Sequence, residues 1–142
     1  MTDRQASVGI HQLNKLDWIV GERRKIAARY HEAFSDIDCI RLLLEEEGYY
    51  CNYQSYSIYL LPGCPVSRND LMQRLLDMGI SSRRGIMTTH RETAYKEESK
   101  NVHLPDSEHA ADNSIIIPLY IPMTEEEINK VIHYFREILT TK

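Results

Sequence analysis

Near the end of the chain the sequence reads Ser114-Ile115-Ile116-Ile117-Pro118-Leu119-Tyr120, and this stretch decides the fold. Three consecutive isoleucines are typical of a buried β-strand, and they make this the clearest strand of the sequence. Proline cannot donate a hydrogen bond to a neighbouring strand. Pro118 therefore predicts that the strand lies at the edge of a sheet or ends early.

An amphipathic helix is predicted to follow this strand and to close the chain. Thr124 and Glu127 have the spacing of a capping box, and Glu125 and Glu126 suit the first turn of a helix. The apolar residues then recur at helical spacing, at Ile128, Val131, Ile132, Phe135, Ile138 and Leu139. The strand and this helix together indicate a sheet with a helix packed on one face.

The middle of the chain predicts a strand, a turn, a helix and a second strand. The tyrosine-rich run from Tyr49 to Leu61 favours a strand, and Pro62 with Gly63 ends it. A helix is expected from a capping box at Ser67 to a C-cap at Gly79, followed by an extended segment over 80–84. Its predicted buried face consists of Leu71, Met72, Leu75 and Leu76.

The first third of the chain predicts two helices, and residues 85–113 predict a long polar loop. Thr2 and Gln5 form a capping box, Asn14 is a plausible break and N-cap, and the apolar stripe continues to about Ser35. Ser107 could cap a short helix within the loop. The order of strand, turn, helix and strand is typical of a small α/β unit, and the whole chain, 1–142, is predicted to be one α+β domain with two layers.

Composition excludes several classes of protein. The chain has 142 residues and a formal net charge of -4, which argues against nucleic acid as its main partner. No apolar run is long enough to span a membrane and no signal peptide is recognisable, so a cytoplasmic location is expected. Cys39, Cys51 and Cys64 are too widely spaced for a zinc knuckle and are expected to be buried or half-buried thiols.

Chemistry is concentrated in one segment, Ser81 to His90. The sequence contains no common nucleotide-binding or hydrolase motif, and its histidines are not spaced to share a metal ion. Arg83 and Arg84 are adjacent in an extended segment, so they should point to opposite faces, and one of them could bind a phosphate or carboxylate. A pair of surface arginines and a solvated His90 are the alternatives on residue types alone.

The motifs in order resemble those of the DegT/DnrJ/EryC1/StrS aminotransferases. Met1 to Gly9 is similar to the family's "MTDIQAAIG", and Gly79 to Met87, with His90 and Tyr95, is similar to a "GI-S/T-T-RRGIM…H…AY" segment. Asn52 to Tyr56 resembles an aromatic strand, "Y-H/Q-x-Y". The segments 13–30, 114–120 and 123–127 resemble "QLxxLDxxIxxRRxIAxxY" and "SIxLPLYPxMTEEE".

The resemblance implies the small C-terminal domain of a fold-type I enzyme that depends on pyridoxal phosphate, with a short and largely antiparallel sheet packed against helices. Such enzymes transfer an amino group, usually from glutamate, to a nucleotide-linked keto sugar, and they form their active sites at a homodimer interface. The cofactor lysine and its partner aspartate precede the "MTD" motif in the family. The resemblance therefore implies that this chain lacks the cofactor-binding large domain, holds no cofactor by itself and contains no catalytic residue.

The substrate-binding residues that the resemblance implies are Arg83, Arg84, His90, Tyr95, Tyr53 and Gln54. Lysines at positions 15, 25, 96, 100, 130 and 142 lie outside any apolar context that would favour imine formation, so this chain alone is expected not to transaminate. Two alternatives stay open. One is a non-catalytic homologue that serves as a binding or dimerisation module, and the other is an unrelated α+β enzyme that uses His90.

Overall fold

The computed structural model describes residues 1–140, which form a four-stranded sheet with helices on both of its faces. No helix in this range is long and apolar enough to cross a membrane. The helices are α1 (Asp3–Leu13), α2 (Leu16–Phe34), α3 (Arg68–Asp77), α4 (Pro105–Asn113) and α5 (Glu125–Thr140), with short 3-10 helices η1 (Thr89–Arg91) and η2 (Thr93–Tyr95). The strands are β1 (Ile40–Leu42), β2 (Tyr56–Leu60), β3 (Arg83–Arg84) and β4 (Ser114–Ile117).

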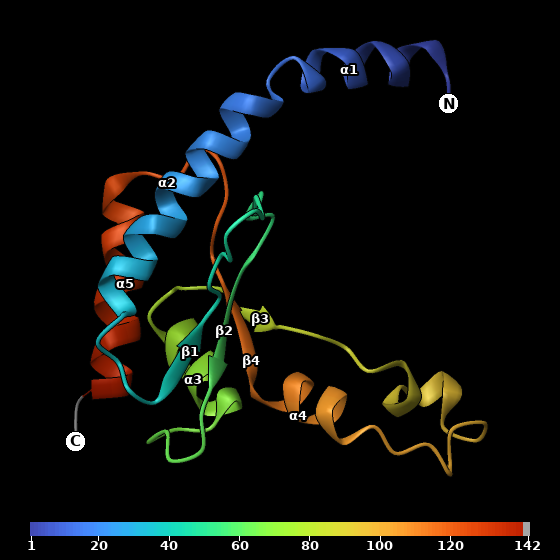
Figure 1. Cartoon of the computed structure of the whole chain (residues 1–142), viewed down its shortest axis with the longest axis vertical. Helices are drawn as coiled ribbons and strands as arrows, with labels where there is room; N and C mark the ends of the chain where they lie inside the picture. The colour runs from blue at the N-terminus through green and yellow to red at the C-terminus, as the bar shows by residue number, and fades with distance from the viewer. Residues whose placement is uncertain (141–142) are drawn as a thin grey trace.

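The sheet has the order β1-β2-β4-β3, and every neighbouring pair is antiparallel. The helices α2 and α5 run side by side, and α3 packs against α5 and β4 (Figure 1). On the opposite face, α4 reaches β2 through a contact between the Tyr59 hydroxyl and His109 Nδ1. The α+β class with an antiparallel sheet is therefore confirmed.

The core lies between the sheet and the layer formed by α2, α3 and α5. Ile58 and Ile115 are opposite each other in β2 and β4, and both are fully buried. The ring centroids of Phe34 and Phe135 are 4.7 Å apart, so they join α2 to α5. The Tyr30 hydroxyl donates a hydrogen bond of 2.8 Å to the carbonyl of Pro118. The one polar atom of this buried side chain therefore has a partner inside the core.

The predicted capping boxes form completely at the starts of α1 and α5, whereas at the start of α3 only the bond from the backbone amide to the serine hydroxyl forms. Thr2 accepts from the amide of Gln5, whose side chain accepts from the Thr2 amide, and Ser67 accepts from the amide of Asp70. Thr124 and Glu127 make the same reciprocal bonds at the start of α5. Asn14 is the C-cap of α1 rather than the N-cap of α2, a position that Lys15 occupies without a side-chain bond.

Several strand predictions are wrong in extent. The strand β2 begins only at Tyr56, because the chain turns at Tyr53, whose φ is +44°. Only Arg83 and Arg84 of the predicted segment 80–84 pair with the sheet. β4 ends at Ile117, directly before Pro118, so the prediction that this strand ends early is confirmed, and the alternative of an edge strand is excluded because β4 lies between β2 and β3. β1 was not predicted, because three residues are too few for a pattern of alternation.

Side-chain burial on the helices departs from the predicted stripes at a few positions. In α3, Leu71 and Leu75 are fully buried, whereas Leu76 is exposed, which contradicts its predicted place in the core. In α5, Ile132 and Ile138 are only partly buried at the rim of the stripe. The three cysteines are half-buried free thiols, as expected.

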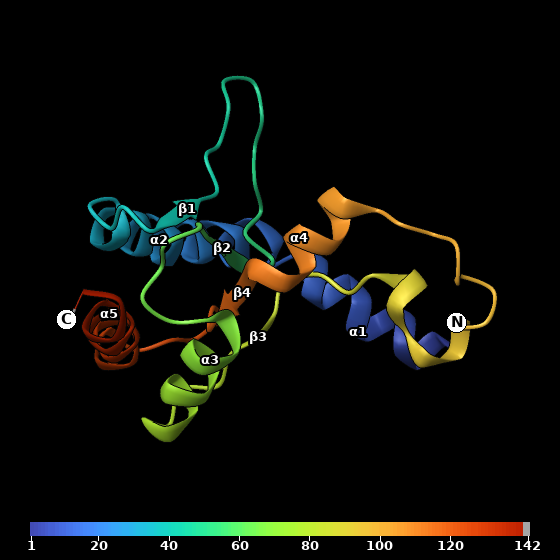
Figure 2. The ribbon, with the colours of Figure 1, turned by 90° about the horizontal axis from the view of Figure 1, so that it is seen from below.

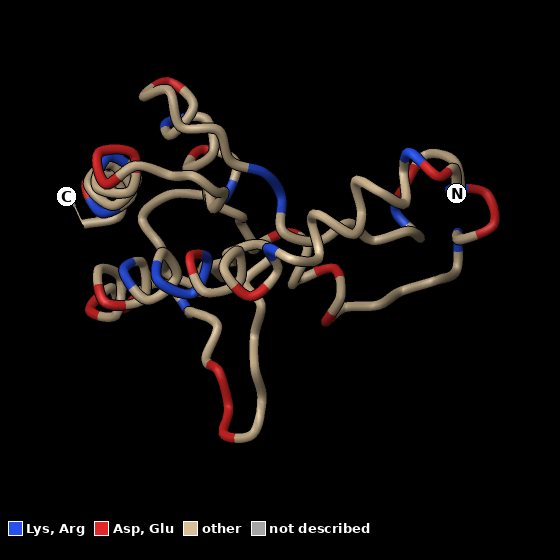
Figure 3. The backbone as a smooth tube through the Cα atoms, turned by 90° about the horizontal axis from the view of Figure 1, so that it is seen from above, with Lys and Arg blue, Asp and Glu red and all other residues tan. Residues whose placement is uncertain are grey.

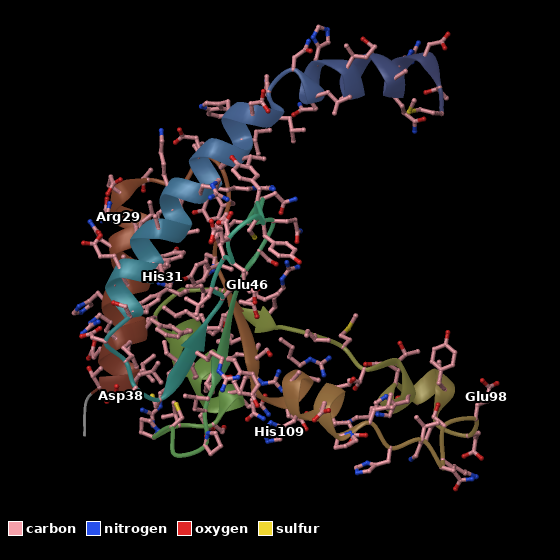
Figure 4. All side chains as sticks on the ribbon, in the orientation of Figure 1. Arg29, His31, Asp38, Glu46, Glu98 and His109 are labelled. Carbon is pink, nitrogen blue, oxygen red and sulfur yellow. The ribbon has the colours of Figure 1, made fainter. Side chains whose placement is uncertain are left out.

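Three segments project from the body formed by the sheet, α2, α3 and α5. They are α1, the 43–55 loop between β1 and β2, and the 85–104 arm that carries η1 and η2 (Figures 1 and 2). Acidic residues gather at the tip of the 43–55 loop, where Figure 3 shows a red stretch, and Glu98 lies at the far end of the arm (Figure 4). None of α1 is buried, and Thr88 is the one buried residue of the 85–104 arm.

Candidate functional site

The main cavity of the body formed by the sheet, α2, α3 and α5 has a volume of about 540 Å³ and lies where β3 begins, β4 ends and α5 passes. The segment before β3 supplies Ser81 and Ser82, and the segment before β2 supplies Gln54 and Ser55. The residues after β4 and the first turns of α5 complete the wall. Its apolar lining is Ile80, Ile116, Ile117, Pro118, Leu119, Met123 and Val131.

Polar groups that could hold a ligand face this cavity from its rim. The Ser82 hydroxyl is buried and has no hydrogen-bond partner among the described residues. Because an unpaired buried hydroxyl costs free energy, Ser82 is suited to bonding a ligand that enters the cavity. Arg83 and Lys130 add positive charge, and Gln54 adds an amide that can both donate and accept.

One carboxylate lines the cavity, and its bonds within the protein fix it. Glu127 accepts from the backbone amide of Thr124, from the Tyr120 hydroxyl and from the Thr124 hydroxyl. These bonds lower the pKa of Glu127. Tyr120, also in the cavity wall, has a raised pKa because its hydroxyl donates to this carboxylate. Glu127 is therefore ionised at neutral pH and positions Tyr120.

The strand β3 sends its two arginines to different cavities. Arg83 is paired with Ile116 and lines the main cavity, whereas Arg84 is paired with the fully buried Ile115 and lines a second cavity of about 180 Å³. The prediction that these side chains point to opposite faces is therefore confirmed. Gly85 follows directly, and a Cβ atom there would lie 2.4 Å from the Cβ of Ser114, so only glycine fits.

The structure brings together only two of the six residues predicted to bind substrate, Arg83 and Gln54. Tyr53 lies beside Arg24, whose guanidinium also stacks on Tyr50 at 4.1 Å from the ring centroid. This position is a loop before β2 and not the predicted aromatic strand, because its backbone turns with positive φ.

His90 and Tyr95 lie on the 85–104 arm, outside the main cavity. His90 is not a solvated histidine: its side chain is only 10% exposed, and its Nε2 lies 2.9 Å from Glu108 Oε1. Glu108 also accepts from the backbone amide of Leu104, and these bonds lower its pKa to about 2, the backbone bond having the larger effect. Tyr95 is 47% exposed. Within residues 1–140 the two side chains do not join the main cavity.

Sequence reasoning missed Lys130, Tyr120 and Glu127 as residues of the site. Lys130 was placed outside any pocket, but its ammonium lies at the cavity, close enough to Gly79 to contact a Cβ atom there at 3.4 Å. The signal was the spacing of Glu127, Lys130 and Val131, which puts them on neighbouring positions of the helix surface. That spacing could not be used before α5 was known to pass the start of β3.

Residues 1–136 match the sequence model of the DegT/DnrJ/EryC1/StrS aminotransferase family, and the chain belongs to that family. It is similar to an aminotransferase, TlmJ, from Streptoalloteichus hindustanus, with 28% identity and a TM-score of 0.84 over 94% of this chain and 35% of that one. It is also similar to the putative sugar aminotransferase Spr1654 from Streptococcus pneumoniae in its PLP form, with 27% identity and a TM-score of 0.87 over 97% of this chain.

The chain spans about a third of each of these structures, since it covers 35% of TlmJ and 36% of Spr1654. The fold is thus the one that a fold-type I aminotransferase has over this third of its length. The family depends on pyridoxal phosphate, which the Spr1654 structure contains.

The main cavity does not fit pyridoxal phosphate as a complete site. An imine needs a lysine held in the cavity, but Lys130 is an exposed side chain at the rim. The pyridine nitrogen needs an acidic partner, but the carboxylate in the wall, Glu127, is already bonded to Thr124 and Tyr120. On the surface, Lys25 forms an ion pair with Glu22, and Lys100 forms one with Glu97. Lys142 lies outside the described residues.

Proposed function

We propose that this chain is the C-terminal domain of a pyridoxal-phosphate-dependent aminotransferase that acts on a nucleotide-linked keto sugar. Glutamate is the proposed amino donor. The chain supplies the part of the active site that contacts the substrate, together with contacts to a second subunit. Membership of the family and the likeness to sugar aminotransferases support this proposal. The cytoplasm is its proposed location.

The main cavity carries the proposal because its chemistry suits a polar ligand with an apolar face. Ser82, Gln54 and Arg83 present a hydroxyl, an amide and a guanidinium to the same space. A sugar has hydroxyl groups for the first two, and a guanidinium can bind a carboxylate or a phosphate oxygen with two parallel hydrogen bonds. The aliphatic side chains of Ile116 and Leu119 pack against the C–H surface of a ring.

Within this proposal the chain's own residues bind and orient the substrate. When bound, pyridoxal phosphate stabilises the carbanion that forms as an amino group is transferred. Arg83 holds an anionic substituent, and Ser82 donates to or accepts from a sugar hydroxyl. Tyr53, His90 and Tyr95 remain predicted substrate contacts of the whole enzyme. They would contact the substrate when the 43–55 loop and the 85–104 arm pack against the other parts of that enzyme. By itself, the chain is expected not to transaminate.

The test uses the enzyme that contains this chain and measures its two half-reactions separately. Arg83→Ala is expected to reduce the rate constant with the nucleotide-linked keto sugar by the equivalent of roughly 1–3 kcal/mol, the usual cost of losing a charge-assisted contact. Ser82→Ala should act in the same direction with a smaller effect. Arg74→Ala, which removes an exposed arginine of α3, is the control. Normal kinetics of Arg83→Ala with both substrates would remove Arg83 from the site.

The claim about the isolated chain has a separate test. Pyridoxal phosphate added to the chain should give no stable imine band beyond the absorbance of the free cofactor, and borohydride should fix it to no single lysine. A band that borohydride converts into one labelled lysine would contradict the proposal. Lys130 is the position to inspect first, because it lines the main cavity.

The second candidate function is a non-catalytic assembly module, and the apolar surface around the junction of α1 and α2 favours it. Leu13, Leu16 and Trp18 are 68%, 49% and 56% exposed. Exposed apolar patches of this kind mark protein interfaces. Light scattering after size exclusion tests this candidate, since a self-associating module forms dimers that Leu13→Asp with Leu16→Asp would dissociate. Only the catalytic candidate also requires Arg83→Ala to slow the half-reaction with the keto sugar.

A further inference from the structure

A second, polar cavity lies on the other side of β3 from the main one. It has a volume of about 180 Å³ and is formed by the start of α3, the end of β3, η1 and the end of α4. Three arginines line it, Arg68, Arg84 and Arg91. The remaining lining residues are Ile86, Met87, Thr88, Glu92, Ala111 and Asp112.

Arg68 is the half-buried member of this arginine cluster. Its Nη1 donates to the carbonyl of Ala111 at 3.3 Å, but its Nε is buried and has no partner among the described residues. Burial and the neighbouring charge of Arg84 both lower the pKa of Arg68. A guanidinium stays protonated at neutral pH, so Arg68 keeps its charge beside a like charge.

The charges around this cavity are only partly balanced. Arg91 is paired with Asp112 through two hydrogen bonds from Nη1 of 2.9 and 3.0 Å. Among residues 1–140, Arg68 and Arg84 have no such carboxylate partner, although Glu92 also lines the cavity. Two unpaired arginines, one with a buried unbonded N–H, create a site where an anion would both pair the charge and accept the bond.

We propose that Arg68, Arg84 and Arg91 bind a phosphate group in this second cavity. A phosphate can offer a separate oxygen atom to each of the three guanidinium groups, whereas a carboxylate has only two oxygen atoms to share among them. The volume of about 180 Å³ admits a phosphate group but not a nucleoside with it. The ligand is thus inorganic phosphate or the phosphate end of a larger molecule that extends outside the cavity.

This site does not depend on the proposed sugar site. Arg83 and Arg84 serve different cavities, so a variant of one leaves the other in place. If the phosphate belongs to a nucleotide, Arg84 keeps its predicted role in substrate binding. If only free phosphate binds, Arg84 belongs to a separate anion site.

The test is calorimetric titration of the purified chain with inorganic phosphate, with sodium chloride of equal ionic strength as the blank. Saturable binding is expected, weakened at least about tenfold by Arg84→Gln and by Arg68→Gln because each removes a charge-assisted contact. Arg74→Gln removes an exposed arginine of the same helix as Arg68, and it should change the affinity by less than about twofold. Asp112→Asn frees Arg91 and should tighten binding.

Further arms identify the ligand and guard against misfolding. Uridine diphosphate that binds the wild type and fails with Arg84→Gln assigns the phosphate to a nucleotide, whereas binding of inorganic phosphate alone assigns it to the free ion. Circular dichroism checks the folding of each variant, and Arg84→Gln carries the test if Arg68→Gln does not fold. The proposal is overturned if phosphate gives no saturable binding, if Arg74→Gln weakens it as much as Arg84→Gln, or if glutamate binds as tightly.

Discussion

The body and the three projecting segments differ in the interactions that stabilise their structure. In the body, apolar side chains such as Phe34, Ile58 and Phe135 are buried almost completely. In the 85–104 arm and the 43–55 loop, the contacts are mostly polar, including His90–Glu108, Arg91–Asp112 and Arg24–Glu45. Burial of its own apolar side chains therefore stabilises the body. The projecting segments leave their apolar residues exposed, where another protein surface can cover them.

The largest expected effect tests the body. Phe135→Ala removes a fully buried ring that packs on Phe34, so it should lower the free energy of unfolding by about 3–5 kcal/mol. Leu13→Ala, at an exposed position of α1, should change it by no more than about 0.5 kcal/mol. Urea denaturation measures both. Equal losses would mean that α1 belongs to the body in solution and would end the distinction.

The next effect concerns the place where the arm leaves the body. Gly85→Ala puts a Cβ atom against Ser114, where the space is closed, and should cost roughly 1–3 kcal/mol through local displacement. Gly21→Ala meets no atom within 4 Å in the middle of α2 and should instead stabilise the chain by about 0.5–1 kcal/mol. The same denaturation experiment resolves the opposite signs. A neutral Gly85→Ala would show that β3 can shift freely away from β4.

A smaller effect sharpens the description of the 43–55 loop. Arg24 donates to the carbonyl of Cys51 at 2.7 Å and pairs with Glu45, so Arg24→Ala should release the loop. Protease cleavage within 43–55 should become several times faster, with a melting temperature changed by no more than about 2 °C. Lys25→Ala breaks an exposed pair with Glu22 and serves as the control. Cleavage that is equally slow in both variants would assign the order of the loop to its other contacts.

The smallest effect is a pH dependence of the arm. The pKa of Glu108 is lowered from 4.5 to about 2 by bonds from the Leu104 amide and His90. A lowered carboxyl pKa contributes stability that is fully present above the ordinary value and is lost as the pH falls toward the lowered one. The protection of the Leu104 amide against hydrogen exchange, relative to its intrinsic rate at each pH, should therefore fall between these two values.

Glu108→Gln should produce the same loss of protection already at neutral pH, because the neutral glutamine side chain lacks the charge that binds His90 and the Leu104 amide. Glu97→Gln, which removes an exposed carboxylate of the same arm, should leave the exchange at Leu104 unchanged. Protection at Leu104 that survives both acid and Glu108→Gln would mean that apolar contacts hold the arm.

The body was largely predictable from the sequence, and the reason is periodic burial. The stripes of α2 and α5 and the isoleucines of β4 indicate their inward faces directly, and capping residues mark the starts of α1, α3 and α5 but not those of α2 and α4. β1 could not be predicted, because its three residues form a strand through pairing with β2 and not through a pattern of their own. The tyrosines before β2 favour a strand, but the positive φ of Tyr53 and the hydrogen bonds of Arg24 override that preference.

The candidate site was only partly predictable. The alternation of a strand correctly separates Arg83 from Arg84, yet no local pattern shows that Gln54 joins the first and Arg68 the second. These contacts depend on the strand order, which places β3 beside β4. They also depend on the position of the start of α3, which lies next to the end of β3. His90 is a predicted substrate contact with a solvated histidine as the alternative, and no local pattern shows its bond to Glu108, which lies eighteen residues further along the chain.

The shortness of β3 has a consequence for how the two cavities are maintained. A slip of one residue in its pairing with β4 would turn both arginines over, so each would leave its own cavity. Either slip would also replace Gly85 opposite Ser114 by Arg84 or Ile86, whose Cβ atoms cannot fit there. The glycine thus forbids the two neighbouring registers. Gly85 therefore keeps Arg83 and Arg84 in their own cavities, although it contributes no side chain to either cavity.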